Sequence, residues 1–92
     1  MSRPPDTEHV FRALGHPVRR RIVELLARGE RSAGELIEAG RLHRPGLSAH
    51  LRTLRLTGVI GYRRRGNRLV YNLNRSAISR ASDWISSMQR SK

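Results

Sequence analysis

The sequence lacks cysteine, is poor in aromatic residues and has no long apolar run. Without cysteine the chain forms no disulfide, no Cys-ligated zinc site and no thiol-based sensor. The length of 92 residues predicts one domain. Because only 4% of the residues are aromatic, its core should be modest. A membrane-spanning helix needs about 20 apolar residues, and no segment approaches that length. The first ten residues, MSRPPDTEHV, lack the apolar core of a secretion signal, so we expect a cytoplasmic protein with no membrane partner.

Acidic residues are missing from the whole stretch between residues 39 and 82. Lys and Arg number 19 against 7 Asp and Glu, for a formal net charge of +12. Six of the seven acids precede residue 39, whereas ten arginines lie between residues 39 and 82. A charged surface that serves solubility alone usually mixes the two signs. The asymmetry favours a polyanionic partner, and nucleic acid is the first candidate.

Catalytic and metal-binding patterns are also missing. The sequence has no Ser-His-Asp arrangement, no P-loop and no pair of carboxylates that would line a pocket. The four histidines, His9, His16, His43 and His50, form no close-spaced ligand pair. We therefore expect no enzymatic activity, no cofactor and no metal site of the usual kind. A site assembled between subunits, for example from His9 and an acid, stays open as an alternative.

Apolar residues at helical spacing predict three short helices in the first 40 residues. The first covers residues 8–14. The second runs from Pro17 to about residue 27, with His16 substituting for the usual N-cap residue. The third starts at the capping box SAGE, in which Ser32 caps the helix and the side chain of Glu35 returns the bond.

The stretch HRPGLSAHLRTLRLTG predicts a fourth helix with one apolar and one polar face. Its apolar stripe consists of Leu47, Leu51 and Leu54. Pro45 lies near the helix start, and Gly46 falls inside the first turn, where a better helix former is expected. Leu56 points away from the apolar stripe, and the pattern assigns it no role. Gly40 supplies a short turn between the third and fourth helices, which together form the arrangement that a helix-turn-helix reader needs.

The period changes to two in VIGYRRRGNRLVYNL, which predicts a β-hairpin. A two-residue turn at Gly66 and Asn67 sets the register. One face of the hairpin then holds Ile60, Tyr62, Arg64, Leu69, Tyr71 and Leu73, and the other holds Gly61, Arg63, Arg65, Arg68, Val70 and Asn72. We expect the first face to pack on the domain, with Arg64 lying across the apolar side or paired within the domain.

A last helix from Arg75 to about Arg90, capped by Asn74, completes the order of elements. The order α-α-α-α-β-β-α predicts a mainly α fold with a small β-hairpin, a winged helix-turn-helix. We expect a single domain over residues 7–91 that follows a flexible arm at residues 1–6.

Three stretches of the chain resemble the ArsR/SmtB-type family of small bacterial repressors. They are FRALGHPVRRRIVELLARGERSAGELIEAG, LSAHLRTLRLTGVI and RRRGNRLVYNL, which cover about residues 10–73. LSAHL resembles the Ser-x-His-Leu of the family's recognition helix, and the Arg-rich hairpin resembles its wing. The resemblance implies a homodimer that binds a two-fold operator on double-stranded DNA and represses transcription. The chain departs from the family in lacking the Cys-x-Cys of the third helix and the His and acid pairs of the last helix.

Two sets of residues are candidate interfaces. Contact with DNA is expected from the recognition helix, the turn before it and the wing, at His43, Arg44, Pro45, Ser48, Ala49, His50, Arg52, Arg63, Arg65, Asn67 and Arg68. The resemblance places the dimer interface on the first and last helices, at Val10, Phe11, Leu14, Ile78, Trp84, Ile85 and Met88. Plainer interpretations stay open, in which the cations are solvated charges and His50 caps a turn. Arg19, Arg20 and Arg21 either contact phosphate or pair with acids such as Glu24.

Other functions of the same fold stay open. The chain is alternatively a metal-responsive repressor, for example for nickel or zinc, that uses an unusual site. It is alternatively a non-specific architectural nucleic-acid-binding protein, which shares the salt dependence of a repressor but protects no two-fold motif. A third alternative is a protein co-regulator that docks on the terminal helices and controls the protein in place of a metal ion.

Overall fold

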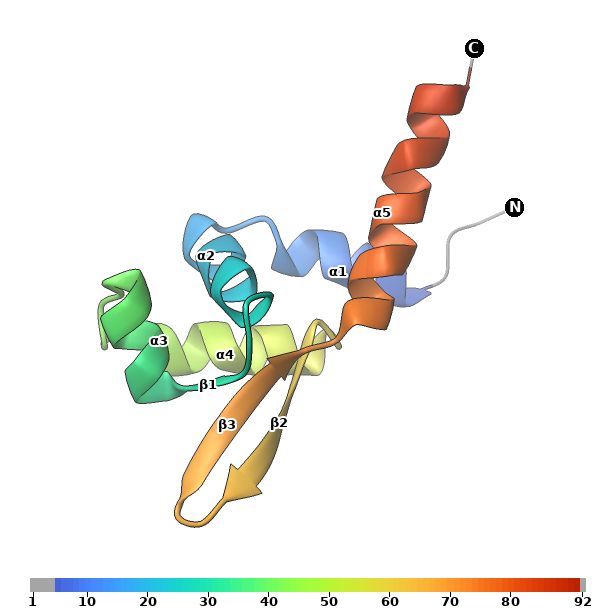
Figure 1. Ribbon diagram of the computed structural model, residues 1–92. Helices are drawn as coiled ribbons and strands as arrows, with labels where there is room; N and C mark the ends of the chain where they lie inside the picture. Colours follow the sequence, from blue (N-terminus) through green and yellow to red (C-terminus); the bar gives the residue numbers. More distant parts are fainter. Residues whose placement is uncertain (1–4, 92) are drawn as a thin grey trace.

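The computed structural model describes residues 5–91, with side chains from residue 7 onward, and shows a winged helix-turn-helix. The elements are α1 (Pro5–Ala13), α2 (Pro17–Leu26), β1 (Arg31–Ser32), α3 (Ala33–Gly40), α4 (Leu47–Leu56), β2 (Ile60–Arg65), β3 (Arg68–Leu73) and α5 (Arg75–Arg90). In Figure 1 the β2–β3 hairpin and α5 project in opposite directions from the body formed by α2, α3 and α4. Residues 1–4 of the expected arm lie outside the described residues, whereas residues 5 and 6 already belong to α1.

Side-chain caps begin three of the helices, as the sequence predicts. His16 accepts a backbone N–H at the start of α2 through its Nδ1 atom, at 3.1 Å. Ser32 Oγ accepts the backbone N–H of Glu35 at 3.2 Å, and Glu35 Oε1 accepts that of Ser32 at 2.8 Å. Asn74 accepts a backbone N–H at the start of α5 at 3.3 Å. These bonds satisfy donors that a helix start would otherwise leave open.

The turn into α4 differs from the prediction in two places. Gly46 precedes the helix as its N-cap with φ 88°, a left-handed conformation that glycine adopts without strain, and α4 begins at Leu47. The left-handed residue after α3 is Arg41, with φ 52°, and not Gly40. Gly40 is needed for another reason: a Cβ atom there would lie 2.8 Å from Cδ1 of Leu25. The glycine therefore lets α3 approach α2.

The sheet has three strands in the order β1-β3-β2, one more than predicted. The hairpin register is confirmed, since Arg65 pairs with Arg68 and Tyr62 with Tyr71. The added strand β1 pairs antiparallel with β3, so that Ser32 lies opposite Val70. Val70, expected on the outer face, is consequently buried. A two-residue strand is too short to show an alternating pattern in the sequence.

The core lies where α1, α2, α3, α4 and α5 meet the base of the sheet. Its buried apolar residues are Val10, Ala13, Ile22, Leu25, Leu26, Leu36, Leu47, Leu51, Leu54, Val59, Ile60, Val70, Tyr71, Ala77 and Ala81. The predicted stripe of α4 is therefore confirmed as its core face. Because that stripe is anchored in the core, the opposite face of α4 is held towards the solvent.

Candidate nucleic-acid interface

The outward face of α4 carries Ser48, Ala49 and Arg52, all of them exposed. Arg52 forms no hydrogen bond or ion pair with any group in the described part of the chain. The exposed turn before α4 contributes three more of the predicted residues, which are His43, Arg44 and Pro45. A helix presented in this way, with short polar side chains and a free Arg, matches what reading of base edges in a major groove requires.

His50 lies on α4 but turns towards α2. Its ring is half-buried, and its centroid lies 4.4 Å from that of His16, the cap of α2. Burial lowers the pKa of His50 below 6.5, and the nearby His16 and Arg19 lower it further. A neutral ring packed in this position is a poorer partner for phosphate than the exposed Arg52.

The arginines at the start of α2 close the end of α1. Arg19 Nε and Arg20 Nη1 each donate to a carbonyl oxygen at that end, both at 2.6 Å. Cations suit this position because the carboxyl end of a helix carries partial negative charge. Arg21 pairs with Glu24 at 3.4 Å, as one of the two sequence interpretations proposed. All three side chains therefore have partners within the chain.

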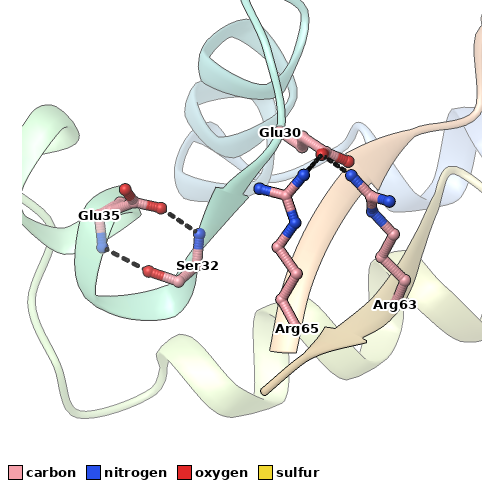
Figure 2. Close-up of polar contacts among 5 residues, drawn as sticks. All are labelled: Glu30, Ser32, Glu35, Arg63 and Arg65. Atoms are coloured by element: carbon pink, nitrogen blue, oxygen red, sulfur yellow. Dashed lines mark hydrogen bonds and ion pairs between the residues drawn. The ribbon is translucent and has the colours of Figure 1, made fainter. Parts of the chain in front are cut away.

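The wing arginines on one face of the hairpin meet a carboxylate. Figure 2 shows Glu30, just before β1, between Arg63 and Arg65. Arg63 Nη2 donates to Oε1 of Glu30, and Arg65 Nη2 lies 3.9 Å from the same oxygen. The hydrogen bond from Arg63 is the main reason that the pKa of Glu30 lies below 4.5, and the same bond raises the pKa of Arg63.

Arg68, across the turn from Arg65, is held by the start of α3. Its Nη2 atom donates to Ser32 Oγ at 2.7 Å and lies 3.4 Å from Oε1 of Glu35. The pKa of Glu35 lies below 4.5, first because it accepts the backbone N–H of Ser32 and, to a smaller extent, because Arg68 is near. The capping box of α3 thus also holds the wing beside its tip.

Arg64 was expected to lie across the apolar side of the hairpin or to pair within the domain, and the expected pairing is absent from the described residues. Its side chain is exposed and forms no hydrogen bond or ion pair with the described residues. The reason is β1, which brings Glu30 and Glu35 to the opposite face of the hairpin. Asn67 is exposed at the tip of the wing, as its place in the turn requires.

The predicted dimer residues divide by exposure. Ile85 and Met88 are about half exposed, Phe11, Leu14, Ile78 and Trp84 are partly buried, and Val10 is fully buried. The rings of Phe11 and Trp84 pack edge to face, with centroids 5.3 Å apart, and join α1 to α5. Val10 has no exposed surface to offer a second copy. The outer side of α5, by contrast, carries large apolar groups in solvent.

Two sets of residues were missed by reasoning from sequence. Glu30 and Glu35 contact wing arginines that lie 33 to 35 residues away in the chain, and no local pattern links the two segments. Leu56 and Tyr62 are exposed large apolar residues, 73% and 48% exposed. The position of Leu56 outside the apolar stripe of α4 was the sequence signal that could have indicated this exposed pair.

Residues 5–91 contain neither a membrane-spanning helix nor a metal-ligand cluster. None of the described helices is both long and apolar enough to cross a bilayer. No three His, Asp or Glu side chains of these residues gather as ligands for a metal ion.

Several known proteins with similar sequences or structures are described as transcriptional regulators. Residues 14–61 match the family description "Helix-turn-helix domain". The chain is 34% identical over 77 residues to the transcriptional repressor SdpR of Bacillus subtilis. The alignment covers 84% of this chain and 86% of SdpR. It is 36% identical over 70 residues to a probable mercury resistance operon repressor of Streptomyces lividans. That alignment covers 76% of this chain and 56% of the relative. The chain thus spans about half the length of the second relative.

A solved structure from Mycobacterium bovis extends the likeness to the fold. It is described as a homodimeric winged helix-turn-helix DNA-binding domain of a possible ArsR-family transcriptional regulator. Its TM-score is 0.73 at 28% sequence identity, and the match covers 92% of this chain and 81% of that one.

Proposed function

The chain belongs to the ArsR-type family of winged helix-turn-helix repressors and is therefore a sequence-specific DNA-binding regulator. We propose that it represses transcription as a homodimer on a two-fold operator. The observation that carries the proposal is the outward face of α4, where Arg52 is exposed and has no partner among the described residues. The dimer covers a promoter and so excludes the polymerase. A regulator of DNA acts where the DNA is, which for a bacterial repressor is the cytoplasm.

Each α4 docks in a major groove. Arg52 reaches a base edge, with guanine as the preferred partner, while Ser48 bonds a base or phosphate and Ala49 meets a thymine methyl group. Arg44, in the exposed turn before the helix, contacts phosphate. The two α4 helices of the dimer lie roughly 34–36 Å apart, one turn of the duplex.

Each wing reaches an adjacent minor groove or its phosphates. Arg64 is free to do so at once, because it has no partner among the described residues. Arg63, Arg65 and Arg68 reach phosphate by leaving the carboxylates of Glu30 and Glu35. All of these ion pairs are solvent-exposed, so the exchange of carboxylate for phosphate is inexpensive.

The homodimer forms through α1 and α5. Ile85 and Met88 present apolar surface that a second copy would bury, beside the packed rings of Phe11 and Trp84. The neighbour from Mycobacterium bovis, described as homodimeric, supports a dimer. The double substitution Ile85→Ser/Met88→Ser should shift the protein from dimer to monomer in sedimentation velocity. A variant that remains dimeric would place the interface elsewhere.

Selection of bound duplexes from a random pool tests the operator. We expect enrichment of a motif with two-fold symmetry. Arg52→Ala should relax the preference at one position of each half-site, whereas Arg44→Ala should weaken binding to all duplexes alike. The loss of one phosphate contact lowers the slope of log affinity against log salt by about 0.9. Arg28→Ala, in the loop before β1, serves as the charge-matched control. Binding with no preference over competitor DNA would reject the operator.

A further inference from the structure

An exposed apolar hollow lies between the carboxyl end of α4 and the start of β2. It has a volume of about 360 Å³ and is lined by Arg55, Leu56, Ile60, Gly61 and Tyr62. Leu56 and Tyr62 are two of the four large apolar residues that the described chain leaves exposed. The other two, Ile85 and Met88, lie on α5 and belong to the proposed dimer interface. The hollow therefore exposes apolar surface that the proposed function does not use.

One arginine without an acidic partner, Arg55, lines this hollow, and two more stand one repeat away on the same strand and helix faces. The guanidinium of Arg55 lies over the ring of Tyr62, 4.9 Å from its centroid. Arg64 follows Tyr62 by two residues and shares its sheet face, and Arg52 precedes Leu56 by one helical turn. None of the three arginines pairs with a carboxylate of the described residues.

The charge around the hollow is of one sign because the chain has no acid between residues 39 and 82. Glu30 and Glu35 are engaged on the other face of the hairpin. A matching occupant needs an apolar side chain to fill the hollow and carboxylates to reach the arginines around it. Phosphate alone meets the second requirement but leaves Leu56 and Tyr62 in water.

We propose that the hollow at Leu56 and Tyr62 docks a segment of a regulatory protein in which a Leu- or Phe-type anchor is flanked by Asp and Glu. The segment and DNA exclude each other, because Arg52 and Arg64 are needed by both. This second statement rests on the proposed DNA interface. Docking would release the repressor from its operator, which provides the chain with an input that requires no metal.

Selection from a library of short random peptides, displayed on phage and free of DNA, tests the docking site. A synthetic copy of the enriched peptide is then measured by fluorescence anisotropy. We expect an acidic consensus with one apolar anchor, and a loss of at least about tenfold in affinity for Leu56→Gln and for Arg55→Ala. Arg28→Ala should stay within about twofold of the wild type. Absence of an enriched consensus, a basic consensus, or affinity unchanged in both hollow variants would overturn the proposal.

Two further measurements separate this occupant from DNA and from a second copy. Leu56→Gln should remain dimeric in sedimentation, and it should lose much less DNA affinity than Arg52→Ala. A shift to monomer would mean that the hollow is part of the dimer interface, and a DNA defect equal to that of Arg52→Ala would make it part of the DNA interface. Either result overturns the proposal. Leu56 is 73% exposed, so the substitution leaves the core intact, and thermal melts confirm folding.

Competition is measured by adding the peptide to a preformed complex of protein and duplex DNA. We expect the peptide to displace the duplex, and simultaneous binding of both would contradict mutual exclusion. The peptide arm contains no DNA. Failure of the operator proposal would therefore appear as an absent two-fold motif while the binding of peptide to the hollow stays measurable.

Discussion

Glu30 holds two wing arginines that we propose to contact DNA, so its removal should strengthen DNA binding. The carboxylate accepts a hydrogen bond from Arg63 and lies near Arg65, and it must give up both when the wing meets phosphate. It also repels the phosphates that replace it. Glu30→Gln keeps the shape of the side chain but removes the charge. The variant should therefore bind the selected duplex more tightly than the wild type.

The exposure of the two ion pairs sets the size of this effect. The side chains of Arg63 and Arg65 are 51% and 65% exposed, so solvent screens both pairs. Exposed pairs of this kind shift an equilibrium by at most about fivefold. We expect the DNA affinity to rise by about two- to fivefold for each wing. When both wings of a dimer engage, the factor is squared, which gives about four- to 25-fold.

The salt dependence should change in a defined direction. In the wild type, the carboxylate freed from the arginines attracts a cation, which offsets part of the counterion release from DNA. The variant has no such carboxylate. The slope of log affinity against log salt should consequently become steeper, by up to about one unit per wing. The advantage of the variant should shrink at high salt, where Coulomb interactions are screened.

Fluorescence anisotropy titrations at pH 7 over a range of salt concentrations provide the measurement. The pKa of Glu30 lies below 4.5, so the wild-type carboxylate is fully charged at this pH. Glu24→Gln is the matched control, because it removes the same charge from an exposed ion pair with Arg21, away from the wing. An affinity for Glu30→Gln that is equal to or below that of Glu24→Gln would refute the reasoning. The carboxylate would then position the wing rather than compete with DNA.

The remaining predictions concern stability. Leu54 is fully buried, so Leu54→Ala should lower the free energy of unfolding by about 2–5 kcal/mol, whereas the same change at the exposed Leu56 should alter it by less than about 0.5 kcal/mol. Urea denaturation at fixed protein concentration measures both, and equal losses would contradict the assigned core. Gly46→Ala forces alanine to φ 88° at a cost of about 1–2 kcal/mol, while Gly34→Ala, inside α3 with open space around it, should stabilise by about 0.5–1 kcal/mol. Melts followed by circular dichroism should move in opposite directions. The pKa of His50 lies below 6.5 in the folded state, so the unfolded chain binds the proton more readily and the free energy of unfolding falls as the pH drops below 6.5. His50→Gln should remove that part of the pH dependence, and a wild type that gains stability on acidification would reverse the sign.

Features set by neighbouring residues were predictable from the sequence alone. The caps at His16, Ser32 and Asn74 depend on bonds that span two or three residues. The hairpin register follows from the turn at residues 66–67 and from the alternation on either side of it. The fold class follows from the order of these elements. Each of these features is decided within one helical turn or one hairpin, where chain connectivity already brings the partners together.

The partners of the wing were decided by the tertiary structure. Arg63 and Glu30 are 33 residues apart, and they meet because the two residues of β1 pair with β3. That pairing also reverses the roles expected for the wing arginines, since it leaves Arg64 free and engages Arg63, Arg65 and Arg68. The exposure of Leu56 beside Tyr62 likewise depends on how α4 meets β2. Sequence periodicity shows which residues share a face, but contacts between distant segments determine which face is covered and which charges remain available to a partner.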